Sequence, residues 1–173
     1  MREKKLYSRM IYRGRVVNLY KDNITLADGR EAVREVIKHK EAICVLPVEG
    51  DSIILVKQFR YPVNKELIEI PAGIIESGEE PEEAAQRELK EETGYGAKSM
   101  KKVFSFYSSP GFTNEKLHLF IAEGLEPGKQ QMDPDEEIDV IKVRGEDLYD
   151  KILNGEIEDS KTILAVLYYL SMQ

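Results

Sequence analysis

The sequence is poor in the features that mark secreted, membrane-spanning or redox-active proteins. It contains one cysteine, Cys44, so an intramolecular disulfide is excluded, and the surrounding apolar run AICVLPV predicts a buried, unreactive thiol. No apolar run approaches the ~18 residues needed to span a bilayer, and the opening MREKKLYSRM is not followed by the apolar segment of a signal peptide. We therefore expect a cytoplasmic protein with no membrane partner.

Clustered positive charge is also missing. The 25 lysine and arginine residues are outnumbered by 32 aspartate and glutamate residues, which gives a formal net charge of −7 at pH 7. The chain has no basic run and no basic segment interleaved with aromatic residues, and nucleic-acid-binding surfaces depend on such patches. We therefore expect no nucleic acid partner.

What the sequence does contain is a series of short strand patterns interrupted by a few helical ones. With 173 residues, 42% of them hydrophobic, the chain can form one sizeable core or a core with a small accessory lobe. Turn signals at Asp28-Gly29 and at Gly50 predict two hairpins. Strands are predicted at residues 15–26, 31–39, 42–48, 52–60, 101–109, 116–124 and 137–144, and helices at residues 81–93, 145–155 and 159–172. This pattern predicts a mixed α/β (α+β) fold.

The helix predicted at residues 81–93 is crowded with glutamates and holds only two basic residues. At ~100° per residue, Glu88, Glu91 and Glu92 lie within an arc of roughly 100° on one face. Carboxylates at this spacing repel one another, and a hard divalent cation such as Mg²⁺ reverses that repulsion. Charge alone favours a solvated surface helix, whereas the shared face favours a Mg²⁺ site for phosphate chemistry.

The residues around this helix decide between the two interpretations. The segment fits the pattern Gly-x5-Glu-x7-Arg-Glu-U-x-Glu-Glu-x-Gly-U, in which U is a bulky apolar residue, and every fixed position is filled. The matching residues are Gly73, Glu79, Arg87, Glu88, Leu89, Glu91, Glu92, Gly94 and Tyr95. This pattern resembles the Nudix box. The resemblance implies the Nudix fold, a mixed β-sheet sandwiched between helices, and Mg²⁺-dependent hydrolysis of a nucleoside diphosphate linked to another moiety.

The resemblance also implies roles for individual residues. Glu88, Glu91 and Glu92 are the expected side-chain ligands of two or three Mg²⁺ ions, with Mn²⁺ as an alternative ion, and the backbone carbonyl of Ala72 is a further expected ligand. The residues expected to hold the box in shape are Gly73, Glu79, Arg87 and Gly94; Arg87 and Glu91 are also counted with the catalytic residues.

Segments outside the box resemble one branch of the family, the ADP-ribose pyrophosphatases. They are LADGREAVREVIKH, VKQFRYPVNKELIEIPAG and GEIEDSKTILAVL, together with Pro110, which follows Gly94 by 16 residues. This resemblance implies that ADP-ribose or a related ADP-sugar is split into AMP and ribose 5-phosphate. It also implies a homodimer, in which residues 1–41 form an N-terminal β lobe on the dimerisation and adenine side and residues 42–173 form the hydrolase domain.

Further site residues follow from the same resemblance. The base in this branch is usually a glutamate from a loop outside the box, and Glu137 is the first choice here and Glu136 the second, although an acidic loop of this kind can also be merely solvated. Arg60 is expected to bind phosphate, with an ordinary strand-end arginine as the alternative. The other expected substrate-binding residues are Arg34 and Glu35 for adenine, Tyr20 or Tyr12 for stacking, and Pro110 with Gly111 in the SSPGF segment.

Two other functions stay open at this point. One is a Nudix hydrolase that acts on another nucleoside diphosphate derivative, such as a dinucleotide or a flavin nucleotide. The other is a Nudix domain that senses a nucleotide without hydrolysing it. The intact box and the lack of a helix-turn-helix pattern before Gly73 argue against the sensing domain.

Overall fold

The computed structural model describes residues 3–132 and 137–172. These residues fall into two compact units, one made of Met1–Glu41 with Phe106–Lys116 and the other of Ala42–Ser105 with Leu117–Gln173. Residues 106–116 therefore group with the amino-terminal strands, through a bridge between Ile37 and Thr113. The functional division predicted at residue 41 stays a prediction.

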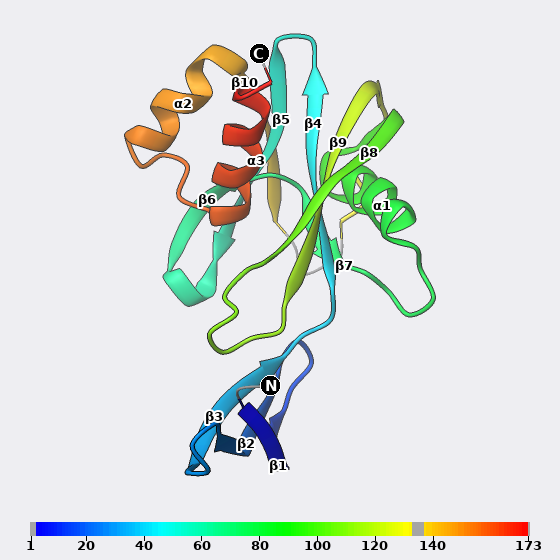
Figure 1. Ribbon diagram of the computed structural model, residues 1–173. Helices are drawn as coiled ribbons and strands as arrows, with labels where there is room; N and C mark the ends of the chain where they lie inside the picture. Colours follow the sequence, from blue (N-terminus) through cyan, green and yellow to red (C-terminus); the bar gives the residue numbers. More distant parts are fainter. Residues whose placement is uncertain (1–2, 133–136, 173) are drawn as a thin grey trace. The chain divides into compact units, whose positions relative to one another are not determined.

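The first unit is built on an antiparallel sheet in the order β1 (Glu3–Arg13), β2 (Asn18–Leu26) and β3 (Glu31–Lys38) (Figure 1). The hairpin predicted at Asp28-Gly29 joins β2 to β3, and Gly29 takes the positive φ of 85° that such a turn needs. The sequence does not predict β1. Its eleven residues are all exposed, so no alternation between buried and exposed positions marks it as a strand.

The second unit contains a mixed sheet in the order β10 (Ile138–Arg144), β5 (Ser52–Arg60), β4 (Ala42–Glu49), β9 (Lys116–Pro127) and β8 (Tyr95–Tyr107). The strands β4 and β9 run parallel, whereas β5 pairs antiparallel with both β4 and β10. Two short strands join the sheet, β6 (Lys65–Glu69) on β5 and β7 (Ala72–Ile74) on β4, with the 3₁₀ turn Tyr61–Val63 before β6. Neither β6 nor β7 is predicted from the sequence, because both are short and hold few buried residues.

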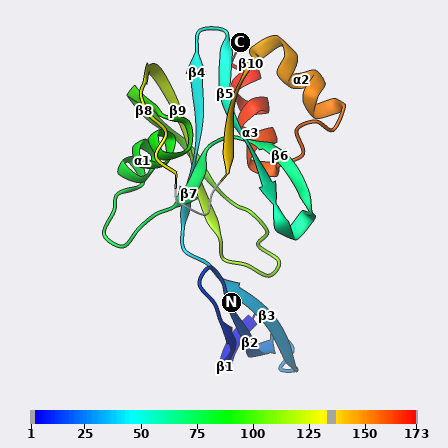
Figure 2. The same ribbon diagram turned by 180° about the vertical axis from the view of Figure 1, so that it is seen from behind.

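The helices are α1 (Pro81–Thr93), α2 (Gly145–Leu153) and α3 (Ser160–Leu170), close to the predicted ranges. Figures 1 and 2 show α1 on one side of the strands and the pair α2 and α3 on the other. Residues of β4 alternate between these sides: Ile43 and Val45 pack in one buried cluster with Leu89 of α1. The predicted mixed α/β (α+β) fold, a sheet between helices, is confirmed.

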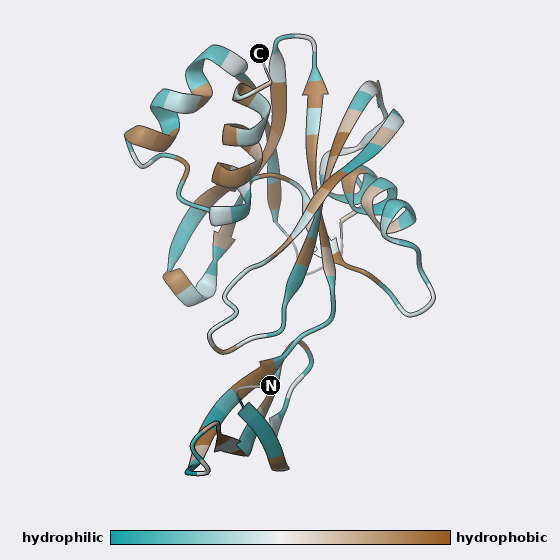
Figure 3. Cartoon of the chain, viewed as in Figure 1, coloured by the Kyte–Doolittle hydropathy of each residue, from teal (hydrophilic) through white to brown (hydrophobic). Residues whose placement is uncertain are grey.

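Apolar residues concentrate on the central strands and on α3, where Figure 3 shows much of the ribbon in brown. The thiol of Cys44 is fully buried in this layer, and burial raises its pKa to about 12. The expected burial of the cysteine is therefore confirmed. Among the described residues, no helix is both long enough and apolar enough to cross a membrane.

Candidate active site

Three of the four glutamates that match the box, Glu88, Glu91 and Glu92, lie on α1, whose ends are set by local sequence. Pro81 occupies the first turn, where its missing N–H costs no hydrogen bond, and the Glu83 carboxylate accepts a hydrogen bond from the N–H of Glu80 at 3.2 Å. The helix ends at Gly94, which adopts the left-handed conformation with φ 78° and donates its N–H to the carbonyl of Lys90. Leu89 is fully buried against the sheet, so the rotation of α1 about its axis is fixed.

Arg87 is the centre of an ion-pair network at this helix. Its guanidinium donates to both oxygens of Glu79, at 2.8 and 3.0 Å, and to the carbonyl of Ile74 at 3.1 Å. The same side chain donates to Glu88 at 2.6 Å and to Glu91 at 2.9 Å. The ion pair that the spacing of Arg87 and Glu91 predicts is therefore present.

These contacts shift the protonation equilibria of the network. The hydrogen bonds that Arg87 donates to Glu79, above all, hold the pKa of Arg87 well above its ordinary value. The hydrogen bond from Arg87 in turn holds the pKa of Glu79 below its ordinary value. Both groups stay charged at neutral pH, so the loop before α1 is tied to the helix by full charges.

The helix face meets β7 closely enough to require a glycine. A Cβ atom added to Gly73 would lie 2.0 Å from Oε1 of Glu88, so any side chain there would displace this carboxylate. The neighbouring residue, Ala72, donates its N–H to Oε2 of Glu92 at 3.2 Å. Glu92 is 6% exposed, which is unusual for a glutamate. The structure therefore brings the box carboxylates of Glu88 and Glu92 to the strand that contains Ala72 and Gly73.

The donor set fits a hard divalent cation. Glu88, Glu91 and Glu92 offer carboxylate oxygens, Ala72 offers a backbone carbonyl, and Gly73 leaves the space in which the Glu88 carboxylate lies. In residues 3–132 and 137–172, no group of three or more His, Cys, Asp or Glu side chains already converges on one point. Instead, Arg87 supplies the positive charge that Glu88 and Glu91 face.

A second charged cluster joins the end of β5 to β6 and α3. Arg60 donates to Glu69 through Nε at 2.6 Å and through Nη2 at 2.8 Å. Lys161 of α3 donates to the same carboxylate and pairs with Asp159 at 3.1 Å. Glu69 is 1% exposed, so its charge is enclosed by two cations.

The cluster keeps Glu69 ionised despite its burial. Burial raises the pKa of Glu69, but the hydrogen bonds and charges of Arg60 and Lys161 outweigh it and the net pKa lies below the ordinary value. The pKa of Arg60 is raised, mainly by its hydrogen bonds with Glu69 and further by the nearby charge of Glu92. Arg60 therefore lies within electrostatic reach of Glu92, and its role in phosphate binding stays a prediction.

The structure describes one of the two glutamates predicted as the base. Glu137 is exposed and immediately precedes β10, where it borders a cavity of ≈ 370 Å³ with Lys57, Phe59 and Met132 among the other lining residues. Glu136 lies outside the described residues. The choice between the two glutamates stays a prediction.

The other predicted substrate residues belong to the first unit. Arg34 and Glu35 lie on β3, and Arg34 pairs with Glu3 at 2.6 Å. The ring of Tyr20 on β2 lies under the amine of Lys38, 3.9 Å from the ring centroid. The remaining three are exposed: Tyr12 on β1, and Pro110 and Gly111 in the turn between β8 and β9.

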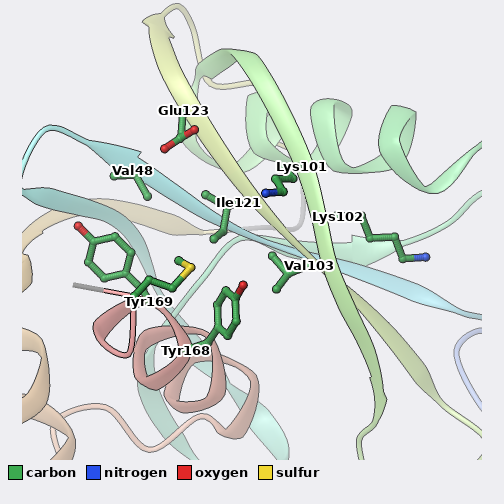
Figure 4. Close-up of a pocket in the computed structure, with 9 residues that line it drawn as sticks. Val48, Lys101, Lys102, Val103, Ile121, Glu123, Tyr168 and Tyr169 are labelled. Carbon is green, nitrogen blue, oxygen red and sulfur yellow. The ribbon is translucent and has the colours of Figure 1, made fainter.

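Another cavity, of ≈ 290 Å³, lies between the strands and the end of α3 (Figure 4). Tyr168 and Tyr169 line it together with Ile121 and Lys101. None of its lining residues belongs to the predicted site.

A mixed sheet between helices, with a glutamate-lined helix beside a strand-to-loop glycine, defines the Nudix class of fold and site. Residues 38–165 match the NUDIX domain family. The chain is 43% identical over 171 residues to an ADP-ribose pyrophosphatase of Bacillus subtilis (strain 168), covering 97% of this chain and 92% of that protein. The protein belongs to the Nudix family, and it is a Nudix hydrolase.

Other relatives are named for other functions. A methanol dehydrogenase activator of Bacillus methanolicus is 40% identical, over 96% of this chain and 91% of its own length. A GDP-mannose pyrophosphatase of Cronobacter sakazakii (strain ATCC BAA-894) is 34% identical, over 87% of this chain and 85% of its own length. A crystal structure of an ADP compounds hydrolase has a TM-score of 0.91 and 21% identity, covering 99% of this chain and 94% of that chain, and confirms the fold.

The sequence patterns do not single out three residues that lie near the box or near Arg60: Glu69, Lys161 and Gln130. The available signal for Glu69 was a charged residue inside the segment ELIEIPAG, and Lys161 stands beside the start of the predicted helix 159–172 with no pattern that marks it. Gln130 carries no signal in one sequence, because its amide bonds the backbone carbonyls of Glu92 and Ile138, and such contacts leave no pattern in the side chains.

Proposed function

We propose that the protein is a Mg²⁺-dependent pyrophosphatase that splits ADP-ribose, or a related ADP-sugar, into AMP and ribose 5-phosphate. The observation that carries this proposal is the intact glutamate face of α1 against Gly73, in a chain similar over nearly its whole length to an ADP-ribose pyrophosphatase. Fold alone would not select this activity, because one fold serves many chemistries.

The box residues would bind the metal through oxygen atoms only. Glu88, Glu91, Glu92 and the carbonyl of Ala72 are the proposed ligands of two or three Mg²⁺ or Mn²⁺ ions. When bound, these ions would neutralise charge on the pyrophosphate and lower the pKa of the attacking water. Arg87, held by Glu79, fixes the positions of Glu88 and Glu91.

Residues outside the box would orient the substrate and move the proton. Glu69 occupies two N–H groups of Arg60, and the fixed guanidinium can direct others at a phosphate oxygen. Glu137 is the proposed base that accepts a proton from the attacking water, with Glu136 as the alternative. Arg34, Glu35, Tyr20, Pro110 and Gly111 are proposed for the adenosine side of the substrate.

A homodimer and a cytoplasmic location complete the proposal. All residues of β1 are exposed, including Leu6, Met10 and Ile11, and a row of exposed apolar side chains is typical of a protein interface. Light scattering on the purified protein tests the dimer, and a mass of 19.8 kDa, that of one chain, would contradict it. The lone buried cysteine agrees with a reducing compartment, which fractionation of the host cell would test.

A substrate panel tests the proposed activity. We expect kcat/KM to be highest for ADP-ribose and lower for GDP-mannose, a dinucleotide and a flavin nucleotide, all with Mg²⁺ present. GDP-mannose is the second candidate because several relatives are GDP-mannose pyrophosphatases. A higher kcat/KM for GDP-mannose than for ADP-ribose would overturn the substrate assignment while leaving the pyrophosphatase chemistry in place.

A further inference from the structure

One side chain joins the end of the box helix to the start of β10. Nε2 of Gln130 donates a hydrogen bond to the carbonyl of Glu92 at 2.7 Å and another to the carbonyl of Ile138 at 3.1 Å. The same nitrogen lies 3.2 Å from Sδ of Met132, but its two hydrogen atoms can serve the two carbonyl oxygens, which are stronger acceptors than a thioether sulfur. Glu92 is a proposed metal ligand, and Ile138 directly follows the proposed base, Glu137.

The segment around Gln130 is seated closely on the last turn of α1. The N–H of Gln131 donates to the carbonyl of Glu91 at 3.0 Å, so two carbonyls of the helix end, which helix geometry leaves unpaired, find donors in this segment. Gly94 and Gly128 permit the approach. A Cβ on Gly94 would lie 2.9 Å from the backbone nitrogen of Gln130, and one on Gly128 would lie 2.8 Å from the carbonyl oxygen of Gly94.

We propose that Gln130 is a positioning residue that sets where Glu137 stands relative to the glutamates of α1. The inference rests on the proposed function, in which Glu137 takes a proton from water held at the box. Gln130 itself touches neither substrate nor metal in this account. It acts through the two backbone carbonyls that it joins. One belongs to Glu92, whose side chain is a proposed metal ligand, and the other belongs to Ile138, the residue next to the proposed base.

Loss of the Gln130 amide should affect only the proton-transfer step. Without the amide, the start of β10 loses its hydrogen-bonded bridge to the end of α1, while its pairing with β5 remains. A base displaced by a fraction of an ångström transfers protons less efficiently. Arg60 is held by Glu69, which also accepts a hydrogen bond from Lys161, and this cluster does not depend on Gln130, so we expect binding of the diphosphate to be preserved. We therefore expect kcat to fall about 10- to 100-fold, while KM stays within about twofold.

A matched pair of variants tests the inference. Gln130→Met keeps the length and bulk of the side chain but removes both donors, whereas Gln131→Ala leaves the backbone N–H that caps Glu91 in place. We expect the loss of kcat in Gln130→Met alone, with both variants folded by circular dichroism. Equal kcat values for Gln130→Met and wild type, or equal losses in the two variants, would overturn the inference. If Gln130→Met does not fold, Gln130→Asn is compared in its place, because the shorter amide cannot reach both carbonyls.

A double-mutant cycle distinguishes positioning of the base from a general structural effect. In a Glu137→Gln background, Gln130→Met should reduce kcat little further, because the group that it positions is already gone. If the losses of kcat in the two single variants multiply in the double variant, the inference is overturned. The effect of Gln130→Met would then come from a change in α1 and not from the position of Glu137. If Glu137→Gln keeps the wild-type kcat, the inference fails while the pyrophosphatase activity stands. If wild type does not hydrolyse ADP-ribose, the proposed function fails, and the inference that rests on it fails as well.

Discussion

Gly73 on β7 lies directly against the carboxylate of Glu88 on α1. An alanine Cβ at this position would come within 2.0 Å of both the carboxyl carbon and one oxygen of Glu88, a separation that neither group can tolerate. The strand and the helix therefore approach each other closely at this point, and the absence of a side chain on Gly73 leaves the space in which the carboxylate of Glu88 lies.

Gly73→Ala should abolish most of the activity without unfolding the protein. The added methyl group displaces Glu88 from its place beside Arg87, and we expect kcat/KM for ADP-ribose to fall by about 100-fold or more. Gly96→Ala is the control, since an added Cβ there meets no atom within 4 Å and we expect its activity to match wild type. Steady-state kinetics on both variants decide the matter, and a Gly73→Ala enzyme as active as Gly96→Ala would show that Glu88 is dispensable.

Arg87→Lys should reduce both stability and activity. A lysine has one charged nitrogen, so it cannot keep the bidentate contact with Glu79 and the bonds to Glu88 and Glu91 together. We expect the free energy of unfolding in urea to fall by about 2 kcal/mol, because half-buried carboxylates lose charged donors. An Arg30→Lys variant, whose pair with Asp28 is exposed, should leave the free energy of unfolding almost unchanged. Equal losses in the two variants would contradict a structural role for the Arg87 network.

Lys161→Met should give a pH-dependent loss of stability. The folded-state pKa of Glu69 lies below its ordinary 4.5 and that of Lys161 above its ordinary 10.5, so their pairing stabilises the fold between these limits. The loss, about 2 kcal/mol near pH 7, should start to shrink as the pH falls below 4.5 and should vanish below the folded-state pKa of Glu69, where the carboxylate is protonated. It should shrink again as the pH rises above 10.5 toward the folded-state pKa of Lys161.

Urea unfolding of Lys161→Met at pH 7 and at pH 3 measures this difference. Lys98→Met removes an exposed pair with Glu126 and serves as the control, for which we expect almost no change at either pH. If the deficit of Lys161→Met is the same at both pH values, the ionised pair with Glu69 does not cause it.

The sequence was a good guide wherever a local pattern determines structure. The bounds of α1 follow from Pro81 and Gly94, and the box spacing predicts the contacts of Arg87. The short strands β6 and β7 and the exposed β1 escaped prediction, because their residues show no periodic burial. Contacts between distant segments also escaped: the links of Lys161 to Glu69 and of Gln130 to Glu92 depend on packing, which one sequence does not reveal.

The most direct test of the central claim is product analysis with ADP-ribose and Mg²⁺, using wild type and Glu92→Gln. Glu92 is the most enclosed of the three proposed ligands, and the amide keeps its size while removing its charge. We predict that wild type releases AMP and ribose 5-phosphate in equal amounts and that Glu92→Gln loses most of this rate while remaining folded. Intact ADP-ribose after incubation of wild type with Mg²⁺ and with Mn²⁺, or a Glu92→Gln enzyme as fast as wild type, would contradict the account.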